Sequence, residues 1–177
     1  MKELKAVLAG FGGQGILFLG KVLANAGLND GKEVSWLPSY GPEMRGGTCN
    51  CSVCISDEPI GSPLVVNPNV LIAMNRPSYE KFIDAVEPGG LVLLDSTLID
   101  AKVERDDVTV YYVDATRLAE ENGLTGLANI ILLGKLLKET GLCSDEGVRK
   151  GLEKSVPPSK KHLVEANLKA IEIGKGC

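Results

Sequence analysis

A glycine-rich turn between an apolar run and a helical run constrains the fold of this 177-residue chain more than any other feature. Residues 4–10 form an apolar run that predicts a buried strand, and residues 16–28 carry apolar side chains at helical spacing. The turn between them fits the pattern G-x-G-x-x-G. Backbone N–H groups at such a helix start suit an anion such as a phosphate. The candidate binding residues of this turn are Gly10, Gly12, Gly13, Gln14 and Gly15.

The rest of the chain alternates apolar runs with helical ones. This alternation predicts a Rossmann-like, doubly wound α/β fold with a mainly parallel sheet, a β-hairpin excursion and a helical C-terminal third. The hairpin is expected from strand 48–56 and a partner strand at 60–66. Further strands are expected at 33–37, 69–75, 91–95 and 108–113, and further helices at 77–86, 115–122, 128–139, 145–154 and 160–173.

Length and composition predict a single domain over residues 1–177. Aromatic residues make up only 5% and the net charge is −4, so nucleic acid and an anionic membrane surface are not expected as partners. No run reaches transmembrane length and the N-terminus has no signal-peptide pattern. Five cysteines in such a chain predict reduced thiols and a cytoplasmic location.

Three closely spaced cysteines raise the question of a metal site. Cys49 and Cys51 would share one face of their strand, whereas Cys54 would point to the other face. The spacing is not that of paired C-x-x-C motifs, so we expect packed free thiols and no metal site in this chain. A small redox or metal module built on these thiols is the alternative.

Binding of a dinucleotide such as NAD is a second alternative for the glycine turn. A Rossmann site also needs an acidic residue at the end of the second strand. Leu37, Pro38 and Ser39 occupy that place. A stand-alone nucleotide-binding Rossmann-like protein is therefore the less favoured hypothesis, and titration with NADH would separate it from the others.

A few other polar residues could carry chemistry, but none predicts a catalytic group. Asp95 and Asp114 end predicted strands, where they could face a ligand or cap the next turn. Asn129 lies in an apolar helical run and needs hydrogen-bond partners if buried. His162 is the only histidine and is expected at the surface.

A second glycine-punctuated segment, residues 39–47, holds an acid and a base two positions apart. Proline fixes φ, and glycines permit backbone angles closed to other residues. We expect the segment to present its charges across a subunit boundary or at the edge of an active site; a solvated surface turn is the alternative. Its candidate residues are Tyr40, Glu43, Met44, Arg45, Gly46 and Gly47.

The two glycine-containing segments together carry a family resemblance. Gly-Phe-Gly-Gly-Gln-Gly at 10–15 and Gly-Pro-Glu-Met-Arg-Gly-Gly at 41–47 resemble the gamma subunit of 2-oxoacid:ferredoxin (acceptor) oxidoreductases. The similarity continues through residues 55–63 and spans most of the chain. Residues 73–78, Ala-Met-Asn-Arg-Pro-Ser, look most like the 2-oxoglutarate branch, with the pyruvate or another 2-oxoacid branch as the alternative.

The resemblance implies a role within a larger enzyme. Such complexes convert a 2-oxoacid and coenzyme A into acyl-CoA, carbon dioxide and two electrons for ferredoxin or another acceptor. Thiamine diphosphate, Mg and Fe–S clusters are expected on partner subunits: alpha, beta and, in a four-chain assembly, delta. This chain is expected to support assembly, to contribute to coenzyme A binding through the glycine turn, and to have no activity alone.

Overall fold

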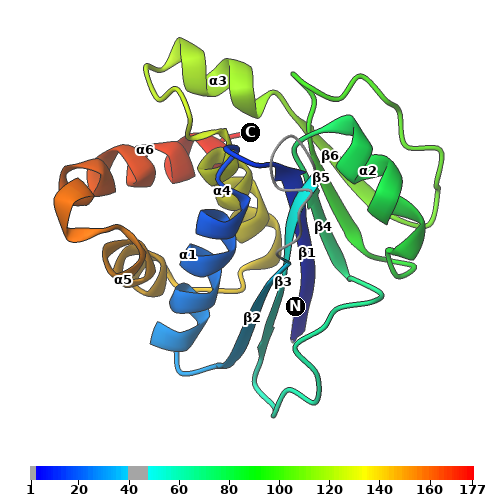
Figure 1. Cartoon of the computed structure of the whole chain (residues 1–177), viewed down its shortest axis with the longest axis horizontal. Coiled ribbons are helices and arrows are strands. Elements are labelled where there is room, and N and C mark those ends of the chain that lie inside the picture. Colours follow the sequence, from blue (N-terminus) through cyan, green and yellow to red (C-terminus); the bar gives the residue numbers. More distant parts are fainter. Residues whose placement is uncertain (1–2, 40–47) are drawn as a thin grey trace.

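The computed structural model describes residues 3–39 and 48–177 and places six strands in one sheet, in the order β2-β3-β1-β4-β5-β6 (Figure 1). β1, β4, β5 and β6 run parallel, whereas β3 is antiparallel to both β1 and β2. The prediction of a mainly parallel α/β sheet is therefore confirmed, with β3 inserted between β1 and β2. The strands are β1 (Glu3–Phe11), β2 (Glu33–Ser39), β3 (Thr48–Ser56), β4 (Val70–Ala73), β5 (Leu91–Asp95) and β6 (Thr109–Val113).

The hairpin excursion is formed by different strands from those predicted. β3 pairs with β2, and the expected partner strand at 60–66 is wrong, since that segment contains no strand. Both edges of β3 are already occupied by β1 and β2, so no edge is left for a third partner. Val65 is instead held by its backbone N–H, which donates to Ser52 Oγ at 3.3 Å. Pro63 has no N–H to give to a ladder.

The helices follow the predicted order with two local changes. The expected helix at 77–86 shortens to α2 and ends as a 3-10 turn, η2. The expected helix at 160–173 begins as the 3-10 segment η3 and becomes α-helical only in α6. The elements are α1 (Ile16–Asn29), α2 (Arg76–Phe82), η2 (Ile83–Ala85), α3 (Ala115–Glu121), α4 (Ala128–Thr140), α5 (Asp145–Ser155), η3 (Pro158–Leu163) and α6 (Val164–Lys175).

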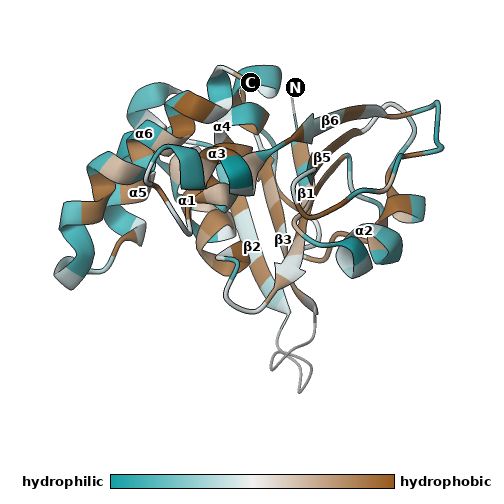
Figure 2. Cartoon of the chain, turned by 90° about the horizontal axis from the view of Figure 1, so that it is seen from above, coloured by the Kyte–Doolittle hydropathy of each residue, from teal (hydrophilic) through white to brown (hydrophobic). Residues whose placement is uncertain are grey.

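The sheet separates two apolar cores. α1 and α4 pack on one face, with α5 outside α1 and α6 outside α4, and α2 lies on the other face (Figure 2). Neighbouring β1 residues point to opposite cores: Leu8 faces α1 and Ala9 faces the α2 side. Central strands buried on both faces explain the continuous apolar run of β1. Within the described ranges, no helix is long and apolar enough to cross a lipid bilayer.

Candidate functional site

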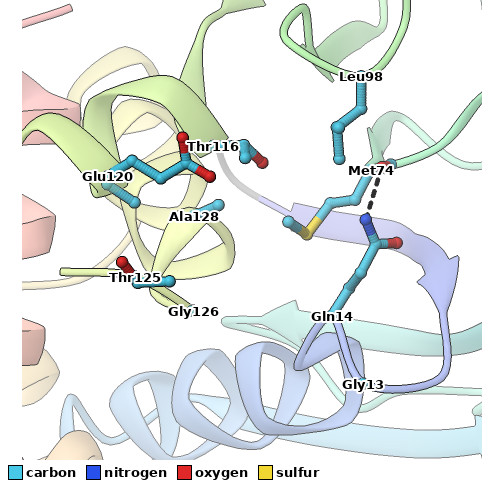
Figure 3. A pocket seen from close by; sticks show the side chains of 10 residues that line it. Gly13, Gln14, Met74, Leu98, Thr116, Glu120, Thr125, Gly126 and Ala128 are labelled. Atoms are coloured by element: carbon cyan, nitrogen blue, oxygen red, sulfur yellow. Dashed lines mark hydrogen bonds between the residues drawn. The ribbon is translucent and has the colours of Figure 1, made fainter.

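A cavity of about 240 Å³ lies at the carboxyl ends of β1, β4 and β5, beside the start of α4 (Figure 3). Ligands in open α/β sheets bind at this edge. At about 30 Å³ per water molecule, the space equals roughly eight waters, enough for a diphosphate or a ribose. The lining residues come from the β1–α1 turn, the ends of β4 and β5, α3 and the start of α4: Gly13, Gln14, Met74, Leu98, Thr116, Ala119, Glu120, Thr125, Gly126 and Ala128.

The glycines of the β1–α1 turn serve different needs. Gly13 and Gly15 have φ values of 101° and 75°, in the left-handed region that favours glycine. A Cβ on Gly10 would come within 2.7 Å of Gln14 Oε1, so a larger residue there would have to displace the side chain of Gln14. Gly12 is not among the residues with positive φ. Of the five candidate residues in this turn, Gly13 and Gln14 line the cavity.

Gln14 holds the turn in place with its side-chain amide. Its Oε1 accepts from the Phe11 N–H at 2.6 Å, and its Nε2 donates to the Met74 carbonyl at 2.9 Å (Figure 3). The amide therefore donates and accepts at once, and it ties the end of β1 to the end of β4. These bonds use one of the two Nε2 hydrogens and one of the two Oε1 lone pairs, so Gln14 shapes the cavity wall and keeps hydrogen-bonding capacity for a ligand.

Two helices begin beside this cavity without a side-chain cap. The N-cap residues are Gly15 for α1 and Leu127 for α4, and neither makes a side-chain capping hydrogen bond. Unpaired N–H groups and the positive end of each helix dipole are therefore available to a ligand. Asn129 joins the two helix starts, since its Nδ2 donates to the Gly15 carbonyl at 3.0 Å. Its Oδ1 is buried and has no partner among the described residues.

Asp95, at the end of β5, fixes the wall of the cavity that α3 provides. The side chain is fully buried. Its carboxylate accepts from the N–H groups of Thr97 and Thr116, at 3.2 and 3.3 Å, and from Thr116 Oγ1 at 2.6 Å. Thr116 and Glu120 lie four residues apart on α3, so both side chains face the cavity. Sequence patterns did not identify either residue. Neither belongs to a recognisable motif, because the cavity is assembled from segments that are far apart in the chain.

The other polar candidates have structural surroundings. Asp114 accepts from Ser96 Oγ at 2.5 Å and pairs with Arg117, and these two contacts lower the pKa of its carboxyl group. His162 is exposed in η3, as predicted. Neither residue lines the cavity.

The three central cysteines do not converge. Cys49 and Cys51 belong to the core beneath α1 and Cys54 to the core on the opposite face, which confirms the predicted split. Burial raises the pKa of the Cys51 thiol to about 12, so it remains protonated at neutral pH. In the part of the chain that the structure describes, no three His, Cys, Asp or Glu side chains are grouped to hold a metal ion. The cysteines therefore give no geometric support to a metal or redox module.

The candidate residues of the second glycine-containing segment, Tyr40, Glu43, Met44, Arg45, Gly46 and Gly47, lie outside the described residues. The residues that flank this segment, Ser39 and Thr48, belong to strands β2 and β3 of the sheet. Ser39 pairs with Asn50, and Thr48 pairs with Phe11. Both ends of the segment therefore join the sheet at the carboxyl end of β1, the edge that also holds the cavity.

Known protein sequences are similar to this chain over almost its whole length. A family model for pyruvate ferredoxin/flavodoxin oxidoreductase matches residues 5–177. The 2-oxoglutarate synthase subunit KorC of Methanocaldococcus jannaschii is 43% identical over 98% of this chain and 91% of its own length. The ketoisovalerate oxidoreductase subunit VorA of Methanothermobacter thermautotrophicus is 41% identical over 97% of this chain. The chain spans only 36% of that VorA protein.

Solved structures share the fold. The keto/oxoacid ferredoxin oxidoreductase gamma subunit of Geobacter sulfurreducens superposes with a TM-score of 0.83 at 30% identity, covering 99% of this chain and 97% of that one. The 2-oxoglutarate:ferredoxin oxidoreductase of Magnetococcus marinus, solved with 2-oxoglutarate, coenzyme A and succinyl-CoA bound, has a TM-score of 0.87 at 25% identity. The superposition covers 99% of this chain and 31% of the Magnetococcus chain.

Proposed function

The chain belongs to the pyruvate ferredoxin/flavodoxin oxidoreductase family, and on that premise we propose that it is the gamma subunit of a 2-oxoacid:ferredoxin oxidoreductase. The observation that carries the proposal is the end-to-end match with whole gamma-type chains, KorC and the Geobacter gamma subunit. VorA contains the same unit within a chain almost three times as long. We therefore treat residues 1–177 as one domain that functions together with the catalytic subunits of the complex.

The proposed assembly oxidises a 2-oxoacid with coenzyme A and passes two electrons to ferredoxin or another acceptor. Thiamine diphosphate with Mg would supply the carbanion chemistry and Fe–S clusters the electron path. The described residues group no set of metal ligands, so these cofactors are assigned to alpha, beta and any delta subunit. The five cysteines are free thiols, which supports a reducing, cytoplasmic compartment.

The 2-oxoacid is proposed to be 2-oxoglutarate. Identity alone does not separate the branches, because KorC is 43% and VorA 41% identical to this chain. The test is co-elution from a tagged chain followed by assays with 2-oxoglutarate, pyruvate and 2-oxoisovalerate. We expect thiamine- and cluster-containing partners and the fastest turnover with 2-oxoglutarate, whereas the purified chain alone should be inactive. A chain that elutes alone, or that turns over by itself, would contradict the subunit role.

The cavity between α1 and α4 is proposed to bind a phosphate group of coenzyme A. Two uncapped helix starts meet there, and Gly13 leaves one wall free of side-chain bulk. At about 240 Å³ the cavity holds only part of coenzyme A, so the remainder must extend over the surface or onto a partner subunit.

A pair of variants at Ala128 separates the effect on binding from the effect on folding. It is the first residue of α4 and lines the cavity. Aspartate at that position favours the helix through its dipole but places a negative charge where the phosphate would lie. Ala128→Asp should therefore raise the KM for coenzyme A more than tenfold. Ala128 is buried, so this variant should also lower the melting temperature; Ala128→Asn, of equal size and uncharged, should lower it as well but leave the KM near the wild-type value. An unchanged KM in an intact Ala128→Asp complex would exclude this site.

Glu43 and Arg45 are proposed to act across a subunit boundary, near the same edge of the sheet. The proposal is supported by the positions of Ser39 and Thr48, which flank their segment. If the pair is buried on assembly, removing one partner costs about 2–5 kcal/mol of association free energy; if it is solvated, about 0–1 kcal/mol. Glu43→Ala and Arg45→Ala should weaken co-elution or activity. Wild-type assembly and rate in both variants would make the segment a surface turn.

A further inference from the structure

The wall of the cavity formed by α3 presents hydrogen-bond acceptors. Thr116 Oγ1 gives its only proton to the buried carboxylate of Asp95, at 2.6 Å. The lone pairs of that hydroxyl are what it can offer to a ligand. Glu120 lies one helical turn further on and lines the same cavity, and its carboxylate has no hydrogen-bond or ion-pair partner within the described ranges. An ionised carboxylate also only accepts.

The opposite side of the cavity presents donors. The β1–α1 turn brings N–H groups without a side-chain cap and the positive end of the α1 dipole, whereas the start of α4 lies on the side of Glu120 (Figure 3). Figure 3 shows the two sides facing each other, with Glu120 and Thr116 on one and Gln14 and Met74 on the other. The cavity is therefore polar in opposite senses across its width.

We propose that Thr116 and Glu120 are specificity-determining residues that select a ligand carrying an N–H or O–H donor beside its anionic group. This inference rests on the proposed coenzyme A site and adds which part of the ligand each wall contacts. A phosphate with a neighbouring ribose hydroxyl or amino group satisfies both sides. A bare polyanion satisfies the start of α1 and is repelled by Glu120. The ligand class is thus a phosphorylated nucleoside, held with its phosphate toward the start of α1 and its donor toward α3.

The test is calorimetric titration of the full chain with two ligands, coenzyme A and pyrophosphate, which has no sugar or base donors. Glu120→Gln removes the charge at nearly constant shape. We expect it to raise the Kd for coenzyme A about tenfold, since the ligand's hydrogen bond to a charged carboxylate becomes a weaker one to a neutral amide oxygen. The same variant should lower the Kd for pyrophosphate at least about twofold, because a like charge is removed. Glu121→Gln is the matched control: it is the next residue on α3 and pairs with Arg117 outside the cavity, so neither Kd should change.

Thr116 provides an independent variant pair. Thr116→Val keeps the shape and removes the acceptor, and it should raise the Kd for coenzyme A about threefold or more with little effect on pyrophosphate. Thr116→Ser keeps the hydroxyl and should bind as wild type. Opposite shifts for the two ligands in Glu120→Gln would not arise from a merely structural role.

The outcomes distinguish a failure of ligand selection by Thr116 and Glu120 from a failure of the proposed coenzyme A site. If wild type binds both ligands but Glu120→Gln shifts both Kd values in one direction, or Thr116→Val matches Thr116→Ser, the selection by α3 is wrong and the proposed site stands. If the wild-type chain binds neither ligand, the proposed coenzyme A site in this chain is wrong and the inference falls with it.

Discussion

The two faces of the sheet are covered by layers of different construction. On one side, α1 and α4 pack on the strands and α5 and α6 form an outer layer. On the other side, the seven-residue α2 and the short η2 are joined by irregular segments. Both layers pack on an apolar core. The first layer adds close contacts between helix backbones, and the second adds hydrogen bonds from a few side chains.

Glycines make the helical layer possible. A Cβ on Gly134 of α4 would overlap the Ile171 carbonyl of α6, and a Cβ on Gly174 of α6 would overlap the Ile131 carbonyl of α4. Gly151 of α5 approaches α1 in the same manner, with its Cβ position 2.8 Å from a backbone nitrogen. Any side chain at these positions must push two helices apart.

Arg105 plays the corresponding part on the opposite face. Its Nη1 donates to the carbonyls of Ile83 and Val86, both at 2.8 Å, and so satisfies the end of η2. Asp107 holds the guanidinium through two further hydrogen bonds, and the hydrogen bond from Arg105 lowers the pKa of the Asp107 carboxyl group. Beyond the apolar core on each face, the helical layer requires small residues at its helix contacts, whereas the α2 layer uses the long side chain of Arg105.

The largest effect is expected in the helical layer. Gly174→Val should lower the free energy of unfolding by about 3 kcal/mol or more, because α6 cannot remain against α4. Urea denaturation measures this change. Gly61→Ala is the control: Gly61 has open space around its Cβ position and no positive φ, so the change should lie within about 0.5 kcal/mol. Equal stability of the two variants would show that the helix contact does not require a glycine.

An intermediate effect is expected on the α2 face. Arg105→Ala removes the donor of the Val86 carbonyl and leaves the Ile83 carbonyl with only the Val86 N–H at 3.3 Å, so it should cost about 1.5–3 kcal/mol of unfolding free energy. Arg149→Ala removes an exposed ion pair with Glu165 and should cost about 0–1 kcal/mol. If both variants lose the same stability in urea, Arg105 is not what holds this layer.

The smallest effect concerns pH. The hydrogen bonds from Lys135 and then Tyr111 hold the pKa of Glu139 below its ordinary value of 4.5. A lowered carboxyl pKa contributes stability that is complete above 4.5 and is lost as the pH falls through the folded-state value. Glu139→Gln should therefore be less stable than wild type at pH 7, by about 0.2–1 kcal/mol, and the two should converge in acid. A difference that persists or grows at low pH would reverse this assignment.

Local features of the fold could be predicted from the sequence, and neighbour relations could not. The strand, glycine turn and helix at residues 4–28 follow from apolar spacing and turn residues, which act within a few positions. Alternation also placed Cys49 and Cys54 on opposite faces. It could not show that β3 lies between β1 and β2, because a side-chain period gives the face and not the neighbouring strand. The apolar residues of 60–66 therefore resembled a strand although both edges of β3 were taken.

The candidate site divides in the same manner. Gly13 and Gln14 belong to a motif and were predicted as binding residues. Thr116 and Glu120 reach the cavity only because α3 and α4 pack beside the carboxyl end of the sheet, about a hundred residues further along the chain. Their types and spacing are ordinary for a surface helix. Only the tertiary arrangement brings both side chains to the same cavity.

Reconstitution of the complex with and without this chain tests the central claim most directly. The claim is that the chain is an obligatory subunit that helps to bind coenzyme A through the cavity at α1 and α4. Partner chains alone should form no acyl-CoA, wild-type chain should restore turnover, and Ala128→Asp should restore assembly with a KM for coenzyme A raised more than tenfold. Full turnover without the chain, or an unchanged KM with Ala128→Asp, would contradict the account.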